Sequence, residues 1–468
     1  MEQMRWNDLL QEDQILRSEG DRRRYATDLY ALRLFQKHVG WTPTLPSVVL
    51  CPSSTKELSD IVKRARETKS PIIPYGAGSG VLAGAECNDE HAVVVSTEKL
   101  NAVGEVDVWN QTVTVGAGVL IRDLENYVNQ QGYILGHYPQ SMELASMGGL
   151  VATRSIGQFS TLYGGIEDLL VGLEAVLPNG EILHIKPNPR KATGPDLRHL
   201  FLGAEGIFGI VTQVTVRVFP IPQAQWKQSY RVGTMREGFG LIRDILQEGV
   251  RPAVVRLHDW LECEKPYSAF MEEGECLLIL LCEGNEEKVA YQQKVIERVI
   301  GDRAKAAGPK PVEIWYTHRN DAADEYEKYG EQGILVDTIE VSANWGNVAD
   351  LYERVTERAY YSIPELIFFS GHSSHSYTNG TNIYFEMGAL PMPGMSLEEI
   401  EKLHRSVWDI IEEETLLLGG AIAHHHGVGK HRVPYLSAEL GEGYEVLTQI
   451  KQALDPDGLL NPGTILPR

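Results

Sequence analysis

The stretch PYGAGSGVLAG, residues 74–84, decides the fold of this chain. Glycines permit positive φ and bring backbone N–H groups close to an anion, so such a loop can hold a pyrophosphate. The stretch lacks the Lys-Ser/Thr ending of a nucleotide-triphosphate loop. It also opens no clear helix followed by an acidic residue about 20 positions on. The P-loop and Rossmann folds are therefore disfavoured, and a tight turn between two strands is the alternative reading of the stretch by itself.

Strand and helix patterns alternate around this loop. Ser54 to Glu57 has the pattern of a capping box and predicts the start of an amphipathic helix over residues 57–68. Asn179-Gly180 predicts a hairpin turn. The other expected elements are strands at residues 91–97, 100–107 and 112–118 and a helix at residues 120–131.

Proline and charge mark a domain boundary near residues 220–227, and repeated β-α-β blocks follow it. An antiparallel sheet with helices on one face would accommodate these blocks. The domains that we expect are an N-terminal helical segment (1–44), a first domain (45–222), a substrate or cap domain (223–440) and a C-terminal segment that packs back on the first domain (441–468).

Composition indicates a soluble globular protein, since 43% of the 468 residues are hydrophobic and 23% are charged. The formal net charge of −21 argues against nucleic acid as a partner, because phosphate neutralisation needs clustered Lys and Arg. No apolar run approaches the roughly 20 residues of a membrane span, and the N-terminus has no signal-peptide pattern. Five scattered cysteines without a CxxC pair fit a reducing compartment. We therefore expect a cytoplasmic protein.

Three consecutive histidines lie in AIAHHHGVGKHR, residues 421–432. The preceding Leu-Leu-Leu-Gly-Gly predicts that a helix ends at Gly419 or Gly420 and that a short strand follows. On a strand, His424 and His426 would face one way and His425 the other. One metal ion would then reach at most two of the three, whereas proton transfer would need only one. The run predicts either a metal site completed from elsewhere or an acid/base site.

Three glycine-rich segments, at residues 71–84, 136–182 and 192–216, follow one another in a specific order and spacing. Together they resemble the PCMH-type FAD-binding domain of the vanillyl-alcohol oxidase superfamily. The resemblance implies an α+β fold: a two-subdomain FAD-binding domain followed by an α+β cap domain with a large antiparallel sheet. The FAD contacts that it implies are Pro74, Gly76, Ala77, Gly78, Ser79 and Gly80, then Pro139, Ser141, Gly148, Gly149, Thr153 and Ser155, and finally Glu205, Gly209, Ile210 and Val211. Some relatives attach FAD through a His or Cys near the first loop; residues 76–84 contain neither, so we expect non-covalent FAD.

Two branches of this superfamily compete. FAD-linked D-lactate and glycolate dehydrogenases carry a metal site built from GHxGDGNxH and a later AEHG. The corresponding stretches here are GHSSHSYTNGTNIYF (371–385) and AHHHGVG (423–429), in which Tyr384 replaces a histidine and His425 replaces a glutamate. Two expected ligands are missing, which disfavours this branch. His372 and His375 with His424 or His426 are retained as an alternative metal set.

The other branch is alkyldihydroxyacetonephosphate synthase, which this chain resembles in AHHHGVGK, LGHYPQS, VVRLHD and IEVSANW. The resemblance implies ether-lipid chemistry: the acyl group of acyl-dihydroxyacetone phosphate is exchanged for a fatty alcohol through an adduct at flavin N5. His425, or failing that His426, would remove a proton beside the ketone, and Tyr384 would act as acid or hydrogen-bond partner. Histidine suits proton transfer near neutral pH, and arginine suits the binding of a phosphate through two donors. The remaining catalytic candidates are Arg256, which would fix the phosphate or tune Tyr384, Arg319 as a second arginine, and His137.

Plainer roles exist for each of these residues. In isolation, Tyr384 would pack on a strand, His137 would cap a turn and Arg256 would form a surface ion pair. The predicted function is thus an FAD-dependent transferase without metal. A D-2-hydroxy-acid oxidoreductase is the alternative, and an unassigned flavin protein is a third reading. The expected partner is a small-molecule or lipid-like phosphate; peripheral membrane contact and a homodimer are left open.

Overall fold

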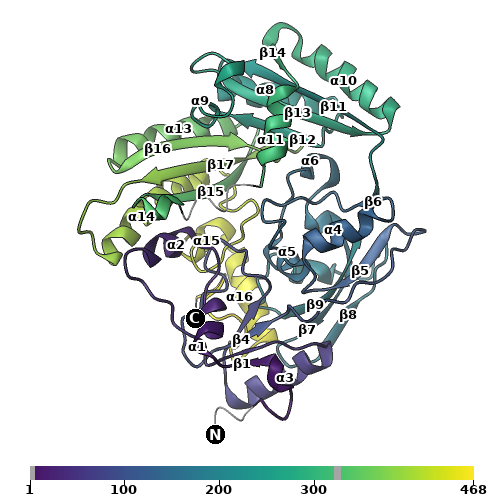
Figure 1. Ribbon diagram of the computed structural model, residues 1–468, viewed down its shortest axis with the longest axis vertical. Coiled ribbons are helices and arrows are strands. Elements are labelled where there is room, and N and C mark those ends of the chain that lie inside the picture. The colour runs from purple at the N-terminus through teal and green to yellow at the C-terminus, as the bar shows by residue number, and fades with distance from the viewer. Residues whose placement is uncertain (1–5, 321–327, 468) are drawn as a thin grey trace.

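The computed structural model describes residues 6–320 and 328–467. Figure 1 shows two lobes, one built from the first half of the chain and one from the second, with the C-terminal helices lying between them and against the first lobe. Within the described residues, no helix combines the length and apolar character needed to cross a bilayer.

The first lobe begins with a small sheet of order β1-β2-β4-β3, in which β2, β4 and β3 are parallel and β1 is antiparallel to β2. Helix α3 (Thr55–Thr68) covers it with the buried residues Leu58, Ile61, Val62 and Ala65. Burial of one such Leu or Ile contributes about 1.5–3 kcal/mol. Ser54 Oγ accepts the Glu57 N–H at 3.2 Å, which confirms the predicted helix start. The strands are β1 (Ile15–Leu16), β2 (Val48–Leu50), β3 (Ile72–Tyr75) and β4 (Val93–Ser96).

A second, antiparallel sheet of order β5-β9-β7-β8 completes the first lobe. The hairpin predicted at Asn179-Gly180 joins β7 (Leu170–Val176) to β8 (Ile182–Ile185). The predicted strand at residues 100–107 is wrong: only Val103 and Asp107 form isolated bridges there. The other elements are β5 (Thr112–Gly116), α4 (Ile121–Asn129), β6 (Tyr133–Ile134), α5 (Met147–Thr153), α6 (Ser160–Tyr163), α7 (Ile166–Leu169), β9 (Ile210–Arg217) and β10 (Phe219–Pro220).

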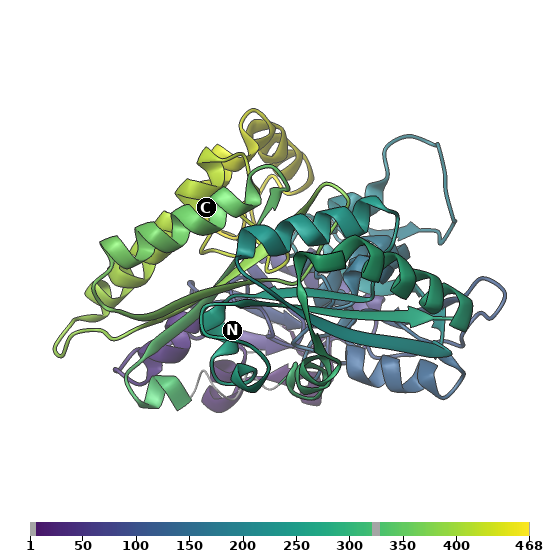
Figure 2. The same ribbon diagram turned by 90° about the horizontal axis from the view of Figure 1, so that it is seen from above.

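The second lobe is a seven-stranded antiparallel sheet of order β14-β11-β13-β12-β16-β17-β15, as the sequence predicted. Its strands are β11 (Ala224–Val232), β12 (Val254–His258), β13 (Cys276–Gly284), β14 (Lys305–Gly308), β15 (Leu335–Asn344), β16 (Leu366–Ser373) and β17 (Gly380–Ala389). Its largest helices are α8 (Met235–Gln247), α10 (Glu286–Ile300), α13 (Val348–Ser362) and α14 (Leu397–Leu417). Figure 2 shows these four helices on one side of the sheet.

The two faces of this sheet have different partners because side chains alternate along each strand. Leu278 and Leu280 of β13 and Phe385 of β17 belong to the large core under the four helices. Leu277 and Ile279 point the other way and pack with Phe159 of the first lobe. The second face therefore looks toward the FAD-binding domain predicted from the sequence. The remaining helices are α1 (Glu19–Arg24), α2 (Ala31–Lys37), α9 (Trp260–Cys263), α11 (Lys310–His318), α15 (Val433–Leu440) and α16 (Gly443–Leu454).

Candidate active site

A transverse row of polar residues crosses four strands of the large sheet on the face toward the first lobe. His258 of β12 pairs with His372 of β16, His372 pairs with Tyr384 of β17, and Tyr384 pairs with Glu340 of β15. Directly opposed residues share a face, so the four side chains lie side by side. Arg256, two residues before His258, joins them on that face. Four buried strands thus carry one continuous polar row.

The three histidines of the run lie on a loop and not on a strand. Helix α14 ends at Leu417, Gly419 has φ +67°, and only Ala421 bridges to β15, at Ser342. The expected alternation of faces is also wrong: the Nδ1 atoms of His424 and His425 lie 2.8 Å apart. The strand does not form because the chain turns at Gly419 and Gly420. After this turn, the backbone N–H groups of His425 and His426 donate to the Glu340 side chain and not to a neighbouring strand.

His424 and His425 gather around a third histidine, His375. Their ring centroids lie 5.1 and 5.0 Å from that of His375. Ser160 Oγ is 2.8 Å from His375 Nδ1, and the Tyr377 hydroxyl is 2.8 Å from His424 Nε2. These two contacts fix the outer nitrogens, so the inner nitrogens of His375 and His424 face the centre of the group.

Tyr384 is the member of the polar row that contacts the rings of the histidine loop. Its ring stacks against His372 at 4.9 Å and, on the other side, against His425 at 6.0 Å. The hydroxyl donates to Thr338 Oγ1 at 2.9 Å and lies 3.5 Å from His426 Nε2. Burial raises the pKa of Tyr384, so the phenol is neutral at neutral pH and can donate its proton.

The histidines of the loop are neutral at neutral pH. Burial lowers the pKa of His424 to about 4 and holds the pKa of His425 well below its ordinary value. Burial also lowers the pKa of His426, although the charge of Glu340 opposes the shift. A neutral imidazole keeps one lone pair, so each ring can accept a proton or ligate a metal.

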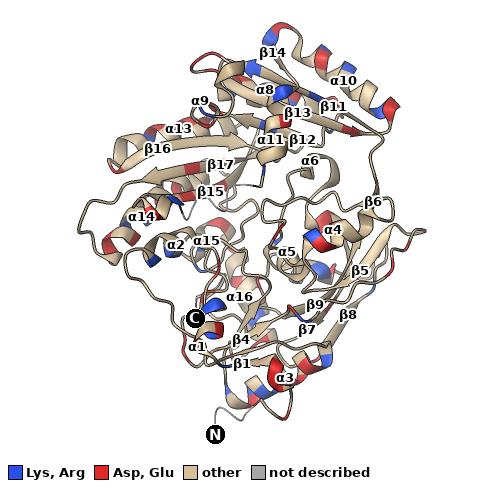
Figure 3. Ribbon diagram, viewed as in Figure 1, with Lys and Arg blue, Asp and Glu red and all other residues tan. Residues whose placement is uncertain are grey.

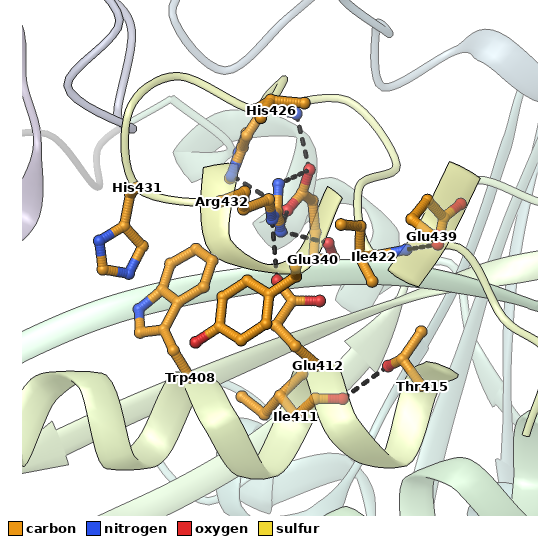
Figure 4. A network of polar contacts seen from close by, with 12 residues as sticks. Glu340, Trp408, Ile411, Glu412, Thr415, Ile422, His426, His431, Arg432 and Glu439 are labelled. Atoms are coloured by element: carbon orange, nitrogen blue, oxygen red, sulfur yellow. Dashed lines mark hydrogen bonds and ion pairs between the residues drawn. The ribbon is translucent and has the colours of Figure 1, made fainter. Parts of the chain in front are cut away.

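Glu340 fixes the backbone of the histidine loop (Figure 4). Its Oε1 atom accepts the N–H groups of His425 at 2.9 Å and His426 at 2.6 Å. Arg432, fully buried, donates to the same carboxylate and, through Nε, to Glu412 at 2.9 Å. Burial is the largest effect and disfavours the charge on Glu340, but the attraction of Arg432, His426 and His425 together outweighs it and holds the pKa of Glu340 well below its ordinary value. Burial raises the pKa of Glu412 to about 7. Glu340 is therefore the ionised partner of Arg432.

Arg256 belongs to a second polar chain at the other end of the row. Its Nε donates to His258 Nε2 at 3.2 Å, which requires that His258 carry its proton on Nδ1. That Nδ1 lies 2.5 Å from Glu262, whose other oxygen is 2.7 Å from His372 Nδ1. Burial opposes ionisation of Glu262, but His372 and His258 outweigh it, so the pKa of Glu262 lies below its ordinary value. Glu262 thereby holds Arg256 and His372 in fixed orientations.

Two groups among the described residues have the composition of a metal site: His375, His424 and His425, and His258, Glu262 and His372. The second is weakened as a metal site by Arg256, because its donation to Nε2 leaves the proton on the Nδ1 that would have to bind the ion. The first has no such conflict. The sequence expectation that no metal is bound stays a prediction.

The three glycine-rich segments converge in the first lobe. A Cβ on Gly76 would lie 2.6 Å from Ser146 Oγ and 3.5 Å from the Gly149 Cα, so the loop touches the start of α5. A Cβ on Gly206 would lie 2.6 Å from Pro74 Cγ, and one on Gly84 would lie 2.8 Å from the Glu205 carboxylate. Such close backbone approach, with N–H groups at a glycine loop and at a helix N-terminus, fits an FAD pyrophosphate.

The members of the predicted FAD set have different surroundings. Glu205 accepts the N–H groups of Val428 at 2.8 Å and Gly429 at 3.0 Å. It therefore joins the third glycine-rich segment to the turn that follows the histidines. Ile210 and Val211, by contrast, pack in the cores of the first lobe. Thr153 Oγ1 donates to the Gly149 carbonyl at 3.0 Å, within helix α5.

Two predicted catalytic residues lie apart from the histidine loop. His137 is buried, and neither of its ring nitrogens has a hydrogen-bond partner among the described residues, which fits contact with a bound group. Burial lowers the pKa of His137 to about 4. Arg319 lies over the ring of Tyr316, 4.1 Å from its centroid, and lines a cavity of about 530 Å³ between the lobes.

The sequence reasoning missed the carboxylates that organise this site. Glu340, Glu412 and Glu262 were not singled out, and neither was His258. The available indication for Glu340 was an acidic residue between the apolar residues Ile339 and Val341 in the predicted strand ILVDTIEVSA. For Glu262 there was none, since its partners come from β12 and β16.

Comparison with known proteins agrees with this architecture. A model of the FAD binding domain matches residues 46–186, and a model of the C-terminal domain of FAD linked oxidases matches residues 222–465. The fold also superposes on a solved alkyldihydroxyacetonephosphate synthase with a TM-score of 0.82 and 22% identity, covering 99% of this chain and 84% of that one. The expected fold and the FAD cofactor are confirmed.

Curated relatives of three kinds match most of the chain. YgcU of Escherichia coli K12, described as an uncharacterized FAD-linked oxidoreductase, is 38% identical, over 92% of this chain and 91% of that protein. Alkyldihydroxyacetonephosphate synthase of Dictyostelium discoideum is 27% identical, over 93% and 75%. Glycolate oxidase subunit GlcD of Bacillus subtilis is 28% identical, over 90% and 89%.

Proposed function

The chain belongs to the FAD-linked oxidase family, and from this premise we propose that it is a transferase resembling alkyldihydroxyacetonephosphate synthase. It would exchange the acyl group of an acyl-dihydroxyacetone phosphate for a fatty alcohol. FAD, when bound, supplies an electron-accepting ring for this reaction. The chain's own residues supply the proton transfers and the substrate contacts.

One observation carries the proposal: the Tyr384 phenol lies beside neutral histidines, at the position where the motif of the metal-bearing branch predicts a histidine ligand. His425 stacks on its ring, and His426 Nε2 lies 3.5 Å from its oxygen. An acyl-for-alcohol exchange needs two proton transfers, one from the carbon beside the ketone and one from the alcohol. His425 is our candidate for the first, and Tyr384 with His426 for the second.

Arg256 is our candidate phosphate ligand. It is buried on the face that looks toward the first lobe, and its guanidinium lies 5.3 Å from the centroid of the Trp315 ring. Its Nε is used by His258, which leaves the terminal N–H groups for an anion. Arg319 lines the cavity between the lobes and is our second, more distant candidate. The substrate that we propose is a small or lipid-like phosphate met in the cytoplasm.

A D-2-hydroxy-acid oxidoreductase is the second candidate, favoured by the trio His375, His424 and His425. Three neutral imidazoles, of which His375 and His424 have an oriented outer nitrogen, suit a divalent metal that would bind the substrate carboxylate and hydroxyl. The relative named glycolate oxidase subunit supports this candidate as well.

The visible spectrum of the bound flavin, taken anaerobically, separates the two candidates. A transferase should leave the flavin oxidised with D-2-hydroxy acids and respond only to the acyl ketone phosphate, with fatty alcohol restoring the band and an ether as product. Lasting bleaching by a hydroxy acid would establish the oxidoreductase instead. Metal analysis gives an independent check, since a divalent ion at full occupancy would also favour the oxidoreductase.

A further inference from the structure

His426 lies between a carboxylate and a phenol. Its Nδ1 is 3.5 Å from Glu340 Oε2, and its Nε2 is 3.5 Å from the Tyr384 hydroxyl. The order carboxylate, imidazole, hydroxyl is that of a triad in which the carboxylate orients a base and the base takes the hydroxyl proton. Both separations are long for hydrogen bonds, as is common in active sites without substrate.

The carboxylate in this arrangement is rigidly held. Glu340 is fully buried, receives Arg432 from below and accepts two backbone N–H groups of the histidine loop (Figure 4). Arg432 is itself anchored by Glu412 at 2.9 Å and by the Gly427 carbonyl at 2.9 Å. Figure 4 shows His426 above Arg432 and Glu340, with helix α14 beneath them. A buried network of ion pairs and hydrogen bonds formed by Glu340, Arg432 and Glu412 therefore lies beneath His426.

We propose that Glu340 is a positioning residue that holds His426 with its proton on Nδ1 and its Nε2 lone pair toward Tyr384. The proposal rests on the proposed proton transfer through Tyr384 but not on which substrate delivers the proton. A substrate hydroxyl gives its proton to the Tyr384 oxygen, and the phenol proton turns from Thr338 Oγ1 and passes to His426 Nε2. The hydroxyl can belong to a fatty alcohol or to a 2-hydroxy acid.

The histidine could also be buried and neutral without Glu340, so the contribution of the Glu340 charge to the state of His426 needs a direct test. The groups that act on His426 are Glu340, Arg432 and Asp337 by charge and His425 and Tyr384 by contact. Glu340 raises the pKa of His426 against the stronger effect of burial. Removing that charge must lower the pKa of His426, and it leaves Glu412 as the remaining carboxylate partner of Arg432, so the positive charge of Arg432 acts more strongly in the same direction.

The test is Glu340→Gln in the FAD-loaded full chain. The amide oxygen can still accept the two loop N–H groups, but the charge is lost. We expect FAD to be retained, kcat to fall about 10²-fold or more while KM changes little, and the acid limb of the kcat/KM profile to move to lower pH. An unchanged kcat and acid limb would overturn the proposal.

Glu414→Gln is the matched control. Glu414 is a buried carboxylate that pairs with Arg354 at 2.7 Å and Arg358 at 3.0 Å, away from the histidine loop. We expect its rate and acid limb to match those of the unsubstituted chain. An equal shift of the limb in both variants would mean a general charge effect and would also overturn the proposal.

A measurement on the unsubstituted chain needs neither folding of a variant nor turnover. In the chain labelled with ¹⁵N-histidine, the His426 ring signals, assigned by their loss in His426→Asn, should be those of the Nδ1-protonated tautomer. Signals of the Nε2-protonated tautomer would overturn the proposal. If neither substrate class reacts while this tautomer is found, the proposed function fails and the positioning of His426 stands.

Discussion

His425 has a different environment from its neighbours in the run. Its ring lies 5.0 Å from His375, 4.5 Å from His426 and 6.0 Å from Tyr384, so it is surrounded by the other proton-transfer candidates. No carboxylate touches its ring among the described contacts, and burial holds the pKa of His425 well below its ordinary value. It is thus a weak, neutral base, suited to a carbon acid whose acidity bound FAD would raise.

We expect His425→Ala to retain FAD and to lose about 10²- to 10⁴-fold of turnover, the usual contribution of a general base. The flavin absorbance per chain and the steady-state rate measure the two parts. His184→Ala is the control, because this histidine is exposed and contacts only Glu174 at 3.1 Å in the first lobe. Full activity of His425→Ala would remove the residue from the mechanism.

Arg256 is the residue whose geometry a lysine cannot reproduce. Its Nε is used by His258 while its terminal N–H groups remain, whereas a lysine offers a single ammonium at a different reach. We expect Arg256→Lys to raise KM for a phosphate substrate about 10- to 100-fold, since hydrogen bonds to charged groups contribute about 1.5–3 kcal/mol. Substrate dependence of the rate gives the value. Arg231→Lys is the control: Arg231 lies on the same sheet and pairs with Glu272, so its substitution should leave KM unchanged. An equal rise of KM in both variants would argue against a phosphate at Arg256.

At the scale of elements, the prediction from sequence succeeded where the pattern is local. The amphipathic helix α3 and the Asn179-Gly180 hairpin follow from spacing within a few residues, and both were placed correctly. The histidine run was misplaced because its conformation depends on Glu340, which is 85 residues away from His425 and accepts its N–H group. The sequence of the run has the pattern of a short strand. It does not show that Glu340, from a distant strand, binds the backbone of the run.

The same limit applies to the site. The sequence named Tyr384, the histidines and Arg256, but not the register that places His372 and Glu340 beside Tyr384 and His258 beside His372. A register follows from how seven strands pack together, and this packing cannot be read from one strand. Carboxylates such as Glu262 gain their role only from that arrangement.

The glycine loop after β3 allows a test of one element. Gly78 has φ +69°, and a Cβ there would lie 2.0 Å from the Tyr75 hydroxyl, so alanine would displace the loop. We expect Gly78→Ala to lower FAD content sharply. Gly249→Ala is the control, because Gly249 has φ +82° with nothing within 4 Å: it should cost about 1–2 kcal/mol of stability but no FAD. Flavin absorbance per chain and the melting temperature distinguish the two, and normal FAD content in Gly78→Ala would argue against this loop as the pyrophosphate site.

At the scale of the whole molecule, the chain end completes the first lobe. Leu460 pairs in parallel with Ile72 of β3, and the Ile465 N–H donates to the Gly429 carbonyl at 2.9 Å. Residues 459–465 therefore tie the start of the glycine loop to the turn that follows the histidines. The predicted FAD segments and the histidine loop, which come from opposite halves of the chain, are joined by residues 459–465.

Asn461 is the residue of this tail with the most specific contacts. It is buried at φ +43°, and its Nδ2 donates to the carbonyls of Gly84 at 3.1 Å and Glu205 at 2.7 Å. Asn461→Gly keeps the positive φ available and removes only the two hydrogen bonds, which contribute about 0.5–1.5 kcal/mol each. We therefore expect FAD to dissociate roughly 5- to 100-fold faster, because each 1.4 kcal/mol is a factor of ten.

Release of flavin fluorescence after dilution measures this rate. Asn347→Gly is the matched control, since its Nδ2 donates to the Leu418 carbonyl at 2.7 Å in the second lobe and touches no FAD segment. If both variants lose FAD at the same rate, the tail does not act on the cofactor site but only on general stability. Faster loss in Asn461→Gly alone would mean that the last residues of the chain secure the cofactor beside the groups that move its substrate's protons.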